Sequence, residues 1–407
     1  MWSKGFLLSL LANFTYWICF FFHVALYPLF LDRQGLDNTT LSNVLAVGAL
    51  GALAGRMVSG WAIDQWGARP FIAFGGFLLA FISPPMVMTD NLFLLYIMRV
   101  VMGFGVGIFT NATLAHITYI SPVENRGRAV SWWGVMNNFA NAVIPPLAVS
   151  LLMVSTFPTT FTIGAMFAIG AGVIGIILPR AHSKPTGLPA GDFPTPVVPH
   201  TERVIAPVRA RTGFRILVRP AIFPGIIAGA MGFALAAFIS FAPLIAEEIG
   251  MENTGLYLTV YAVANVIGQF ASGPISDRMG RRWVILPGFA LAALGMAMLG
   301  FIGSDRLGLL IPFVFGLGTG SGVPGILAWA VDLVKAEEQA LASSTVLVMW
   351  EIFVFGGMLF QGRMMDAGQG ALGYQLMAGL ILSAIGLYMA GLQGTRRKSS
   401  EIITTNQ

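Results

Sequence analysis

Long apolar runs alternate with short polar stretches along the whole chain. Each run is about 20 residues long and contains few charged residues. A helix of about 20 residues crosses the roughly 30 Å hydrocarbon core of a bilayer. Membrane barrel strands would instead alternate apolar and polar residues. We therefore predict twelve transmembrane helices, at about residues 6–31, 41–62, 71–89, 92–116, 129–153, 161–178, 221–246, 255–275, 284–303, 307–331, 339–360 and 372–393.

The composition supports a membrane protein and excludes a soluble one. Of the 407 residues, 56% are hydrophobic and only 10% are charged. Soluble domains carry about 25% charged residues, so a soluble fold would leave too much apolar surface in water. The predicted fold class is an all-α integral membrane protein.

Lys and Arg residues are distributed unevenly between the predicted loops. With the N-terminus inside, eighteen of the 23 lie in inner loops and tails and three in outer loops. Cytoplasmic loops are enriched in Lys and Arg, so we expect an inner (plasma) membrane protein with both termini in the cytoplasm. This topology accounts for the basic charge without a nucleic-acid partner.

A proline-rich segment without helical period divides the chain. It reads RAHSKPTGLPAGDFPTPVVPHTERVIAPVRAR and covers residues 180–211. Such a composition is typical of an extended linker. We predict a six-helix bundle at 1–179, a cytoplasmic linker at 180–215, a second six-helix bundle at 216–395 and a cytoplasmic tail at 396–407.

The two halves repeat each other at a constant offset of 213 residues. The stretch SGWAIDQWGARP at 59–70 returns as SGPISDRMGRRW at 272–283. The same offset places Glu124 on Glu337 and Asn138 on Glu351. A repeat over some eighty residues without a gap predicts two homologous, pseudo-symmetric bundles in parallel order.

The repeated stretch resembles a signature of the major facilitator superfamily. GWAIDQWGAR and GPISDRMGRR are similar to its G-x-x-x-D-x-x-G-x-R/K pattern, which follows helices two and eight. LYIMRVVMGFGVG at 95–107 resembles the helix-four pattern of proton-driven members, and the opening residues resemble bacterial efflux-type members. The resemblance implies twelve helices in a 6+6 arrangement and solute transport by alternating access.

The signature residues predict a cytoplasmic gate. The signature glycines would allow close helix approach, its aspartates would accept from helix N-terminal amides, and Arg69 and Arg282 would pair with Glu124 and Glu337. The alternative is that these residues are only turn and topology signals. The predicted gate residues are Gly60, Asp64, Gly67, Arg69, Glu124, Gly273, Asp277, Gly280, Arg281, Arg282 and Glu337.

Few ionisable residues lie within the predicted spans, and such residues are usually functional. Glu351 stands well inside helix eleven and is the first candidate for a proton carrier, together with Arg99 and His23. The alternative is a neutral hydrogen-bonding group or an ion-pair partner. Arg56, one turn from Gly60, is expected to extend its side chain to the inner interface.

Several polar residues share helix faces that would border a wet cavity between the bundles. On helix one, Asn13, Tyr16, Phe20, His23 and Tyr27 follow a 3–4 spacing along one face. The predicted cavity residues are Asn13, Tyr16, His23, Tyr27, Asn138, Asn141, Tyr257, Tyr261, Asn265, Gln269, Trp350 and Glu351.

These features predict a proton-coupled secondary transporter for a small anionic, zwitterionic or amphipathic solute. Antiporters of the superfamily carry a Gly-rich, Pro-containing stretch in helix five, and NNFANAVIPPLAV at 137–149 resembles it in its prolines but has Asn, Ala and Ile in place of the glycines. The resemblance favours export in exchange for protons, and uptake of an organic anion with protons stays open. A transporter-like sensor is a further alternative. We expect no enzyme activity, no metal site and no cofactor besides the proton gradient. The expected partners are lipid, protons and a small-molecule substrate, with the chain acting as a monomer.

Overall fold

Helices account for almost all of the described chain. The structure is a computed structural model that describes residues 2–122, 126–179, 217–300, 308–334 and 338–405. Within these ranges there is no strand, and one short 3-10 helix, η1 (Pro85–Val87), precedes α4. The long helices are α1 (Lys4–Arg33), α2 (Asn38–Trp66), α3 (Arg69–Ile82), α4 (Leu92–Ile120), α5 (Arg126–Met153), α6 (Phe157–Ile177), α7 (Arg219–Glu248), α8 (Gly255–Met279), α9 (Arg282–Leu299), α11 (Leu310–Asp332), α12 (Gln339–Asp366) and α13 (Gly370–Thr405).

Eleven of these described helices are long and apolar enough to cross a membrane. The remaining long helix, α8, is less apolar because polar residues such as Thr259, Asn265 and Gln269 lie along it. On the molecular surface, large apolar side chains such as Phe81 and Phe93 are exposed. An exposed apolar belt suits a lipid environment. The predicted fold class is confirmed.

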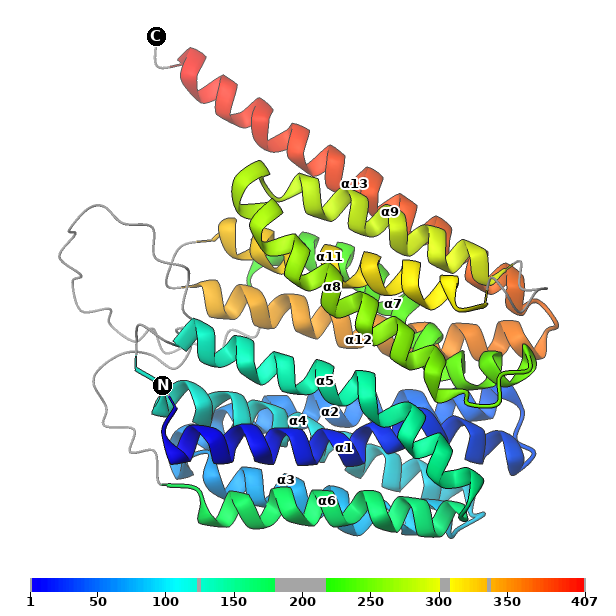
Figure 1. Cartoon of the computed structure of the whole chain (residues 1–407). Coiled ribbons are helices and arrows are strands. Elements are labelled where there is room, and N and C mark those ends of the chain that lie inside the picture. The colour runs from blue at the N-terminus through cyan, green and yellow to red at the C-terminus, as the bar shows by residue number, and fades with distance from the viewer. Residues whose placement is uncertain (1, 123–125, 180–216, 301–307, 335–337, 406–407) are drawn as a thin grey trace.

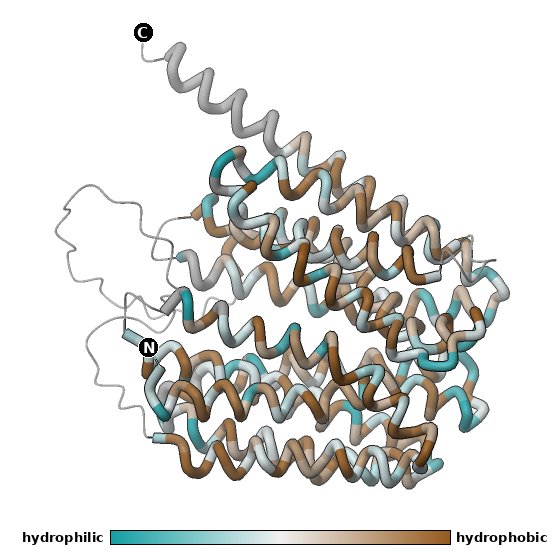
Figure 2. Tube along the Cα trace, in the orientation of Figure 1, coloured by the Kyte–Doolittle hydropathy of each residue, from teal (hydrophilic) through white to brown (hydrophobic). Residues whose placement is uncertain are grey.

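The helices form two bundles that lie against each other (Figure 1). Helices α1 to α6 form the first bundle and α7 to α13 the second. We call the side of the molecule where α6 ends and α7 begins the linker side, and the opposite side the far side. The most hydrophilic segments gather at helix ends and turns on these two sides (Figure 2).

Two predicted segments differ from this description. The linker at 180–215 lies outside the described residues. The predicted tail from 396 onward is not a separate segment, because α13 continues as a helix to Thr405. The chain therefore leaves the second bundle as an extension of its last helix.

The contacts inside the two bundles repeat at the offset of 213 residues. A Cβ atom added to Gly107 would overlap the carbonyl oxygen of Ala52, and one added to Gly320 would overlap that of Asn265. Residues 52 and 107 map onto residues 265 and 320. The contact of Gly103 with Gly48 corresponds in the same way to that of Gly316 with Tyr261. The contact of Gly75 with Phe109 corresponds to that of Gly288 with Gly322. Close backbone contact through glycine thus holds α2 on α4, and α8 on α11, in the same way.

Two signature glycines end helices at equivalent positions. Gly67 follows α2 with φ of 77°, and Gly280 follows α8 with φ of 93°. Residues with a side chain rarely adopt this backbone conformation, so glycine is required at both turns.

We predict that Gly107→Ala and Gly320→Ala each lower stability, because the added methyl group forces two packed helices apart. Overpacking of this kind typically costs about 1–3 kcal/mol. The matched control is Gly170→Ala in α6, where an added Cβ meets nothing within 4 Å. Thermal unfolding in detergent measures the effect, and equal melting temperatures for all three variants would contradict the packing argument.

Candidate functional site

An ion pair joins the two bundles inside the membrane-spanning region. The Arg56 guanidinium on α2 lies 2.7 Å from a carboxylate oxygen of Glu351 on α12. Their side chains are 29% and 12% exposed, so both are largely removed from solvent. Charges at this depth are costly unless paired, and each of these residues supplies the partner of the other.

The position of Arg56 is fixed by α4. The Asn111 amide nitrogen donates to the Arg56 carbonyl at 3.2 Å and to the Ser59 hydroxyl at 3.0 Å. An added Cβ on Gly107 would come within 2.9 Å of the Arg56 backbone nitrogen. The first bundle therefore holds the backbone of Arg56 rigidly and presents its side chain to the second bundle.

A chain of hydrogen bonds joins the other pair of interface helices. Asn138 on α5 donates to Gln269 on α8 at 3.3 Å. Gln269 donates to Asn265 at 2.7 Å, and Asn265 donates to the Thr319 hydroxyl on α11 at 3.0 Å. Thr319 lies 3.4 Å from the Tyr261 hydroxyl and also donates to backbone carbonyls of α11. This polar chain leads from the bundle interface into the second bundle.

The two inter-bundle pairs are equivalent under the internal repeat. Adding 213 takes Arg56 to Gln269 and Asn138 to Glu351. The pseudo-symmetry that exchanges α2 with α8 and α5 with α12 therefore exchanges one pair with the other. One pair is charged and the other is made of neutral amides. We call these four residues the polar layer.

The far-side ends of the bundles are also in contact. The Asp366 carboxylate at the end of α12 accepts from the backbone nitrogens of Asn38 and Thr39, at 2.9 and 2.6 Å. A carboxylate at a helix N-terminus is favourable because it satisfies free amides and meets the positive end of the helix dipole. Asn253 adds bonds to Pro146 and Ser150 at the end of α5. These contacts join the two bundles at the far side.

The predicted cavity face of α1 lies inside the first bundle instead. Asn13, Tyr16, His23 and Tyr27 are at most 1% exposed. Asn13 donates to the Trp133 carbonyl at 3.1 Å and accepts from Trp17.

The other residues of this face have similar surroundings. Tyr16 stacks on Phe109 at 3.7 Å, and His23 lies 2.8 Å from the Ser83 hydroxyl. Neighbouring helices of the same bundle cover these residues, and the Tyr16 and Tyr27 hydroxyls and His23 Nδ1 have no hydrogen-bond partner among the described residues. In this conformation the stripe packs within the bundle.

Arg99 is likewise separated from the polar layer. Its guanidinium lies over the Tyr27 ring at 5.7 Å and donates to the Leu45 carbonyl at 3.4 Å. Both contacts lie in the far half of the first bundle. The structure thus does not bring Arg99 and His23 together with Glu351, although the sequence interpretation grouped them for proton coupling.

The remaining cavity candidates fall into two groups. Asn138, Asn265, Gln269 and Glu351 belong to the polar layer or to the hydrogen-bonded chain beside it. Tyr257 is fully buried against Phe238 in the second bundle, Trp350 packs on α7 at Gly232, and Asn141 is half-buried on α5.

The gate residues are only partly described. The side chains of Asp64, Glu124, Asp277 and Glu337 lie outside the described residues. A Cβ added at Gly60 or Gly273 would meet nothing within 4 Å among the described residues. In this conformation the two glycines therefore do not bring a described neighbouring helix close, contrary to the prediction.

The gate arginines have other partners. Arg69 donates to the Ile176 carbonyl at the end of α6, and Arg281 pairs with Asp332 at 3.1 Å and donates to Ser276. Arg282 lies over the Trp283 ring at 5.5 Å. All of these contacts stay within one bundle.

One expectation about charge is corrected. Arg56 does not extend to the inner interface, because it pairs with Glu351; for Glu351 the structure shows the ion-pair partner that the sequence analysis kept as an alternative. The sequence interpretation also missed Asn111, Thr319 and Asp366. The offset of 213, which already related Asn138 to Glu351, would have related Arg56 to Gln269.

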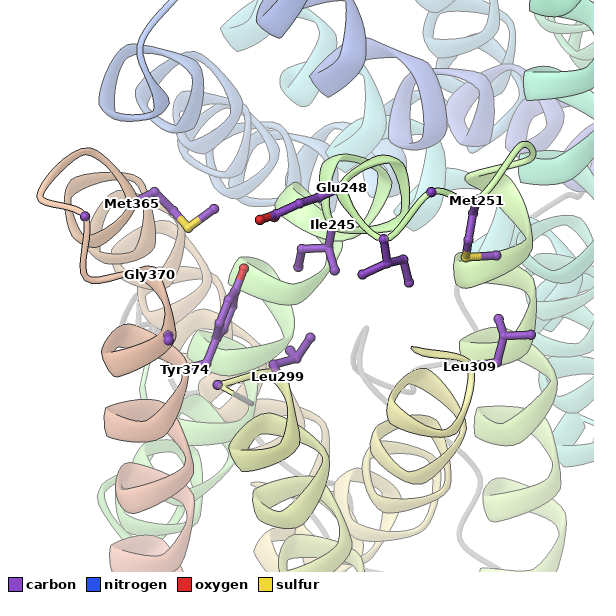
Figure 3. A pocket seen from close by; sticks show the side chains of 13 residues that line it. Ile245, Glu248, Met251, Leu299, Leu309, Met365, Gly370 and Tyr374 are labelled. Carbon is purple, nitrogen blue, oxygen red and sulfur yellow. The ribbon is translucent and has the colours of Figure 1, made fainter. Parts of the chain in front are cut away.

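A separate cavity of about 940 Å³ lies at the far side of the second bundle (Figure 3). Ile245, Glu248, Leu299 and Tyr374 line it, from the ends of α7 and α9 and the beginning of α13. It lies between helices of one bundle, away from the polar layer. No group of three or more His, Cys, Asp or Glu residues suited to a metal occurs among the described residues.

Comparison with known proteins agrees with the fold and the repeat. The sequence profile of the Major Facilitator Superfamily matches residues 9–257 and 225–405. The chain belongs to the major facilitator superfamily. The similar proteins described below are all transporters and not enzymes, which agrees with the expectation of no enzyme activity.

Three relatives in this superfamily have named solutes. The chain is 23% identical over 63% of its length to a probable sulfoacetate transporter of Cupriavidus necator, and 26% identical over 61% to the glycerol-3-phosphate transporter of Bacillus subtilis. These matches span 60% and 59% of the relatives' own lengths. The galactose-proton symporter of Escherichia coli is 22% identical over 78% of this chain and 76% of its own.

Two solved structures in the superfamily share the fold. A variant of the nucleoside transporter NupG aligns over 95% of this chain and 99% of its own, with 12% identity and a TM-score of 0.76. A bacterial homologue of the human lysosomal transporter Spinster, in an inward-facing and occupied conformation, aligns over 95% and 96%, with 13% identity and a TM-score of 0.74.

We predict that Asp366→Ala loosens the far side, because it removes the carboxylate that satisfies the first amides of α2. Cys19, the single cysteine of the chain, is first replaced by alanine. A new cysteine at the buried position of Ser42 then reports opening of the far side through its rate of maleimide labelling. We expect labelling to become at least about threefold faster, in line with the loss of about 1 kcal/mol for a helix cap. Asp90→Asn, an exposed acid on the same side, is the control. Equal rates in the two variants would show that Asp366 does not hold the far side closed.

Proposed function

We propose that this chain carries a small organic anion together with a proton, by alternating access between its two bundles. The observation that carries the proposal is the Arg56–Glu351 ion pair across the bundle interface. Arg56 is the positive group of the polar layer, and the Glu351 carboxylate is the anion that pairs with it in the described structure.

The ion pair makes the binding of an anion and of a proton mutually favourable. An anionic solute that binds Arg56 must displace the Glu351 carboxylate. The displaced carboxylate would then be unpaired at membrane depth and beside a second negative charge, so it takes up a proton. By linkage, protonation of Glu351 in turn releases Arg56 for the anion. For a solute with one negative charge, the loaded site has the same net charge as the empty one.

The relatives support the solute class and the coupling ion. Sulfoacetate and glycerol 3-phosphate, named for two relatives, are both small organic anions. A third relative is a galactose-proton symporter. Two of these matches cover only about three fifths of the relatives, so they support the class of solute and not a particular compound.

The coupling argument favours uptake with protons over export in exchange for protons. Symport requires the two ligands to promote each other's binding, whereas exchange requires them to compete. Export remains the second candidate because α5 keeps Pro145 and Pro146 within a continuous helix. The outcome of the transport experiment below separates the two directions.

The distribution of Lys and Arg supports a cytoplasmic linker side in the inner membrane. The closed far side would then face outward, and the described conformation would be the inward-facing one. In this orientation the solute leaves the polar layer toward the cytoplasm, the side on which a Cβ added at Gly60 or Gly273 would meet nothing within 4 Å among the described residues.

We predict that proteoliposomes holding a pH-sensitive dye acidify inside when sulfoacetate or glycerol 3-phosphate is added outside. Arg56→Gln should reduce uptake at least about tenfold, since the anion loses a charged partner worth more than about 1.4 kcal/mol. Glu351→Gln should still exchange external solute for internal solute across the membrane, but the uptake of solute should no longer acidify the interior.

Asp90→Asn is the control, because it also removes one acidic charge, at an exposed far-side position away from the polar layer. If the interior instead becomes more alkaline as solute enters, the protein exchanges solute for protons. Unchanged uptake and acidification in both Arg56→Gln and Glu351→Gln would contradict the proposal.

A further inference from the structure

We infer that the far-side cavity of the second bundle binds a free organic cation, with an ammonium group at Glu248 and an apolar or aromatic body inside the cavity. The cavity has a volume of about 940 Å³ and lies between helices of one bundle (Figure 3). Sites for small molecules typically have volumes of about 300–1,000 Å³. Because this cavity is separate from the polar layer, the inference does not depend on the anion site.

The first helices of the two bundles match residue by residue. Both α1 and α7 are 30 residues long. The second residue after each helix is a glycine with positive φ, Gly35 at 76° and Gly250 at 78°. Arg33 and Glu248, the last residues of the two helices, are therefore equivalent. The internal repeat thus places opposite charges at the far-side ends of α1 and α7.

In the first bundle, aromatic rings fill the space next to this position. Phe157 at the start of α6 packs against Phe30 of α1, with 5.4 Å between the ring centroids. The Arg33 guanidinium lies over the Phe157 ring, 5.4 Å from its centroid. The first bundle therefore carries its own cation on a pair of aromatic rings at the far side.

In the second bundle, smaller residues leave the equivalent space open. The starts of α6 and α13 are related by the offset of 213, which takes Phe157 to Gly370. The match of α1 with α7 takes Phe30 to Ile245. Gly370 and Ile245 both line the cavity. A ligand with an apolar or aromatic body and a positive charge would supply the rings and the cation that the second bundle lacks.

The residues that line the cavity favour a cation over an anion. Glu248 is the only charged residue among the described residues that line it. Figure 3 shows the Glu248 and Tyr374 side chains directed toward the same end of the cavity, near Met365. Carboxylates and aromatic rings both attract cations. Ile245 and Leu299 provide apolar contacts for the body of the ligand.

Binding of benzyltrimethylammonium to the purified full-length protein tests the inference. Isothermal titration calorimetry in a neutral maltoside detergent compares it with benzyl alcohol, which has the ring without the charge, and with tetramethylammonium, which has the charge without the ring. We expect benzyltrimethylammonium to bind at least about tenfold more tightly than either, because each of the others lacks one of the two matching groups. Equal affinities for benzyltrimethylammonium and benzyl alcohol, or no binding of the cation, would overturn the inference.

Glu248→Gln removes the proposed partner of the ammonium group and keeps the size of the side chain. It should weaken the binding of benzyltrimethylammonium at least about tenfold. Asp90→Asn, which removes an exposed acid on the far side of the first bundle, is the matched control and should bind the cation as the wild type does. Wild-type affinity in Glu248→Gln would overturn the inference. So would loss of binding in Glu351→Gln, because the probe would then occupy the polar layer.

Gly370→Phe tests whether the body of the ligand enters the cavity. It gives α13 the residue that α6 carries at the equivalent position, Phe157, and so fills part of the space. We expect a folded variant, checked by thermal unfolding, to bind benzyltrimethylammonium at least about tenfold more weakly. A folded variant with wild-type affinity would contradict binding in the cavity. If Gly370→Phe does not fold, the comparison of Glu248→Gln with Asp90→Asn decides the question.

Added lipid distinguishes a free cation from a phospholipid headgroup. Phosphatidylethanolamine also carries an ammonium group, but its phosphate would meet no Lys, Arg or His among the described residues that line the cavity. Titrations repeated with phosphatidylethanolamine or phosphatidylglycerol in the detergent should therefore give the same affinity for benzyltrimethylammonium. Weaker binding with phosphatidylethanolamine alone would overturn the assignment to a free cation.

Discussion

The ion pair between Arg56 and Glu351 governs how the two bundles can move. A charge at membrane depth requires a partner, and here the partner stands on the other bundle. Any separation of α2 from α12 at this level must therefore neutralise or replace one of the two charges. In the proposed function, a proton on Glu351 and an anion on Arg56 would do this together, which would link bundle motion to the arrival of both ligands.

Glycines bring helix backbones into close contact inside the bundles and also, at the far side, between them. Gly107 and Gly320 pack inside a bundle, whereas Gly255 of α8 packs on the backbone of Pro145 and Gly362 of α12 packs on the Asn38 carbonyl. Hydrogen bonds and an ion pair also join the bundles, at Asp366 and in the polar layer. Opening of the far side therefore has to separate both kinds of contact.

The fold could be predicted from the sequence because lipid imposes a strong pattern. Run length, composition and the offset of 213 residues together specified twelve helices in two related bundles. Side-chain partners were harder to predict, because helix rotation decides them. Asn13 and His23 share a face with Tyr16, as expected, but that face turns toward α3, α4 and α5 of the same bundle.

Glu351 was identified as a candidate, and its partner was not. Because Arg56 lies one turn from Gly60, near the end of α2, its side chain was expected to reach the inner membrane surface. It reaches Glu351 on α12 instead. The repeat contained the missing information, since the pairing of Asn138 with Gln269 and of Glu351 with Arg56 is the same contact seen twice. Contacts between halves follow from a repeat only once the arrangement of the halves is known.

Proton uptake on solute binding tests the central claim most directly. Purified protein in weakly buffered solution with a pH indicator is titrated with glycerol 3-phosphate, and protons taken up are divided by solute bound. The account predicts about one proton per anion for the wild type, after correction for the solute's own ionisation, and none for Glu351→Gln. Solute binding to the wild type without proton uptake would contradict it.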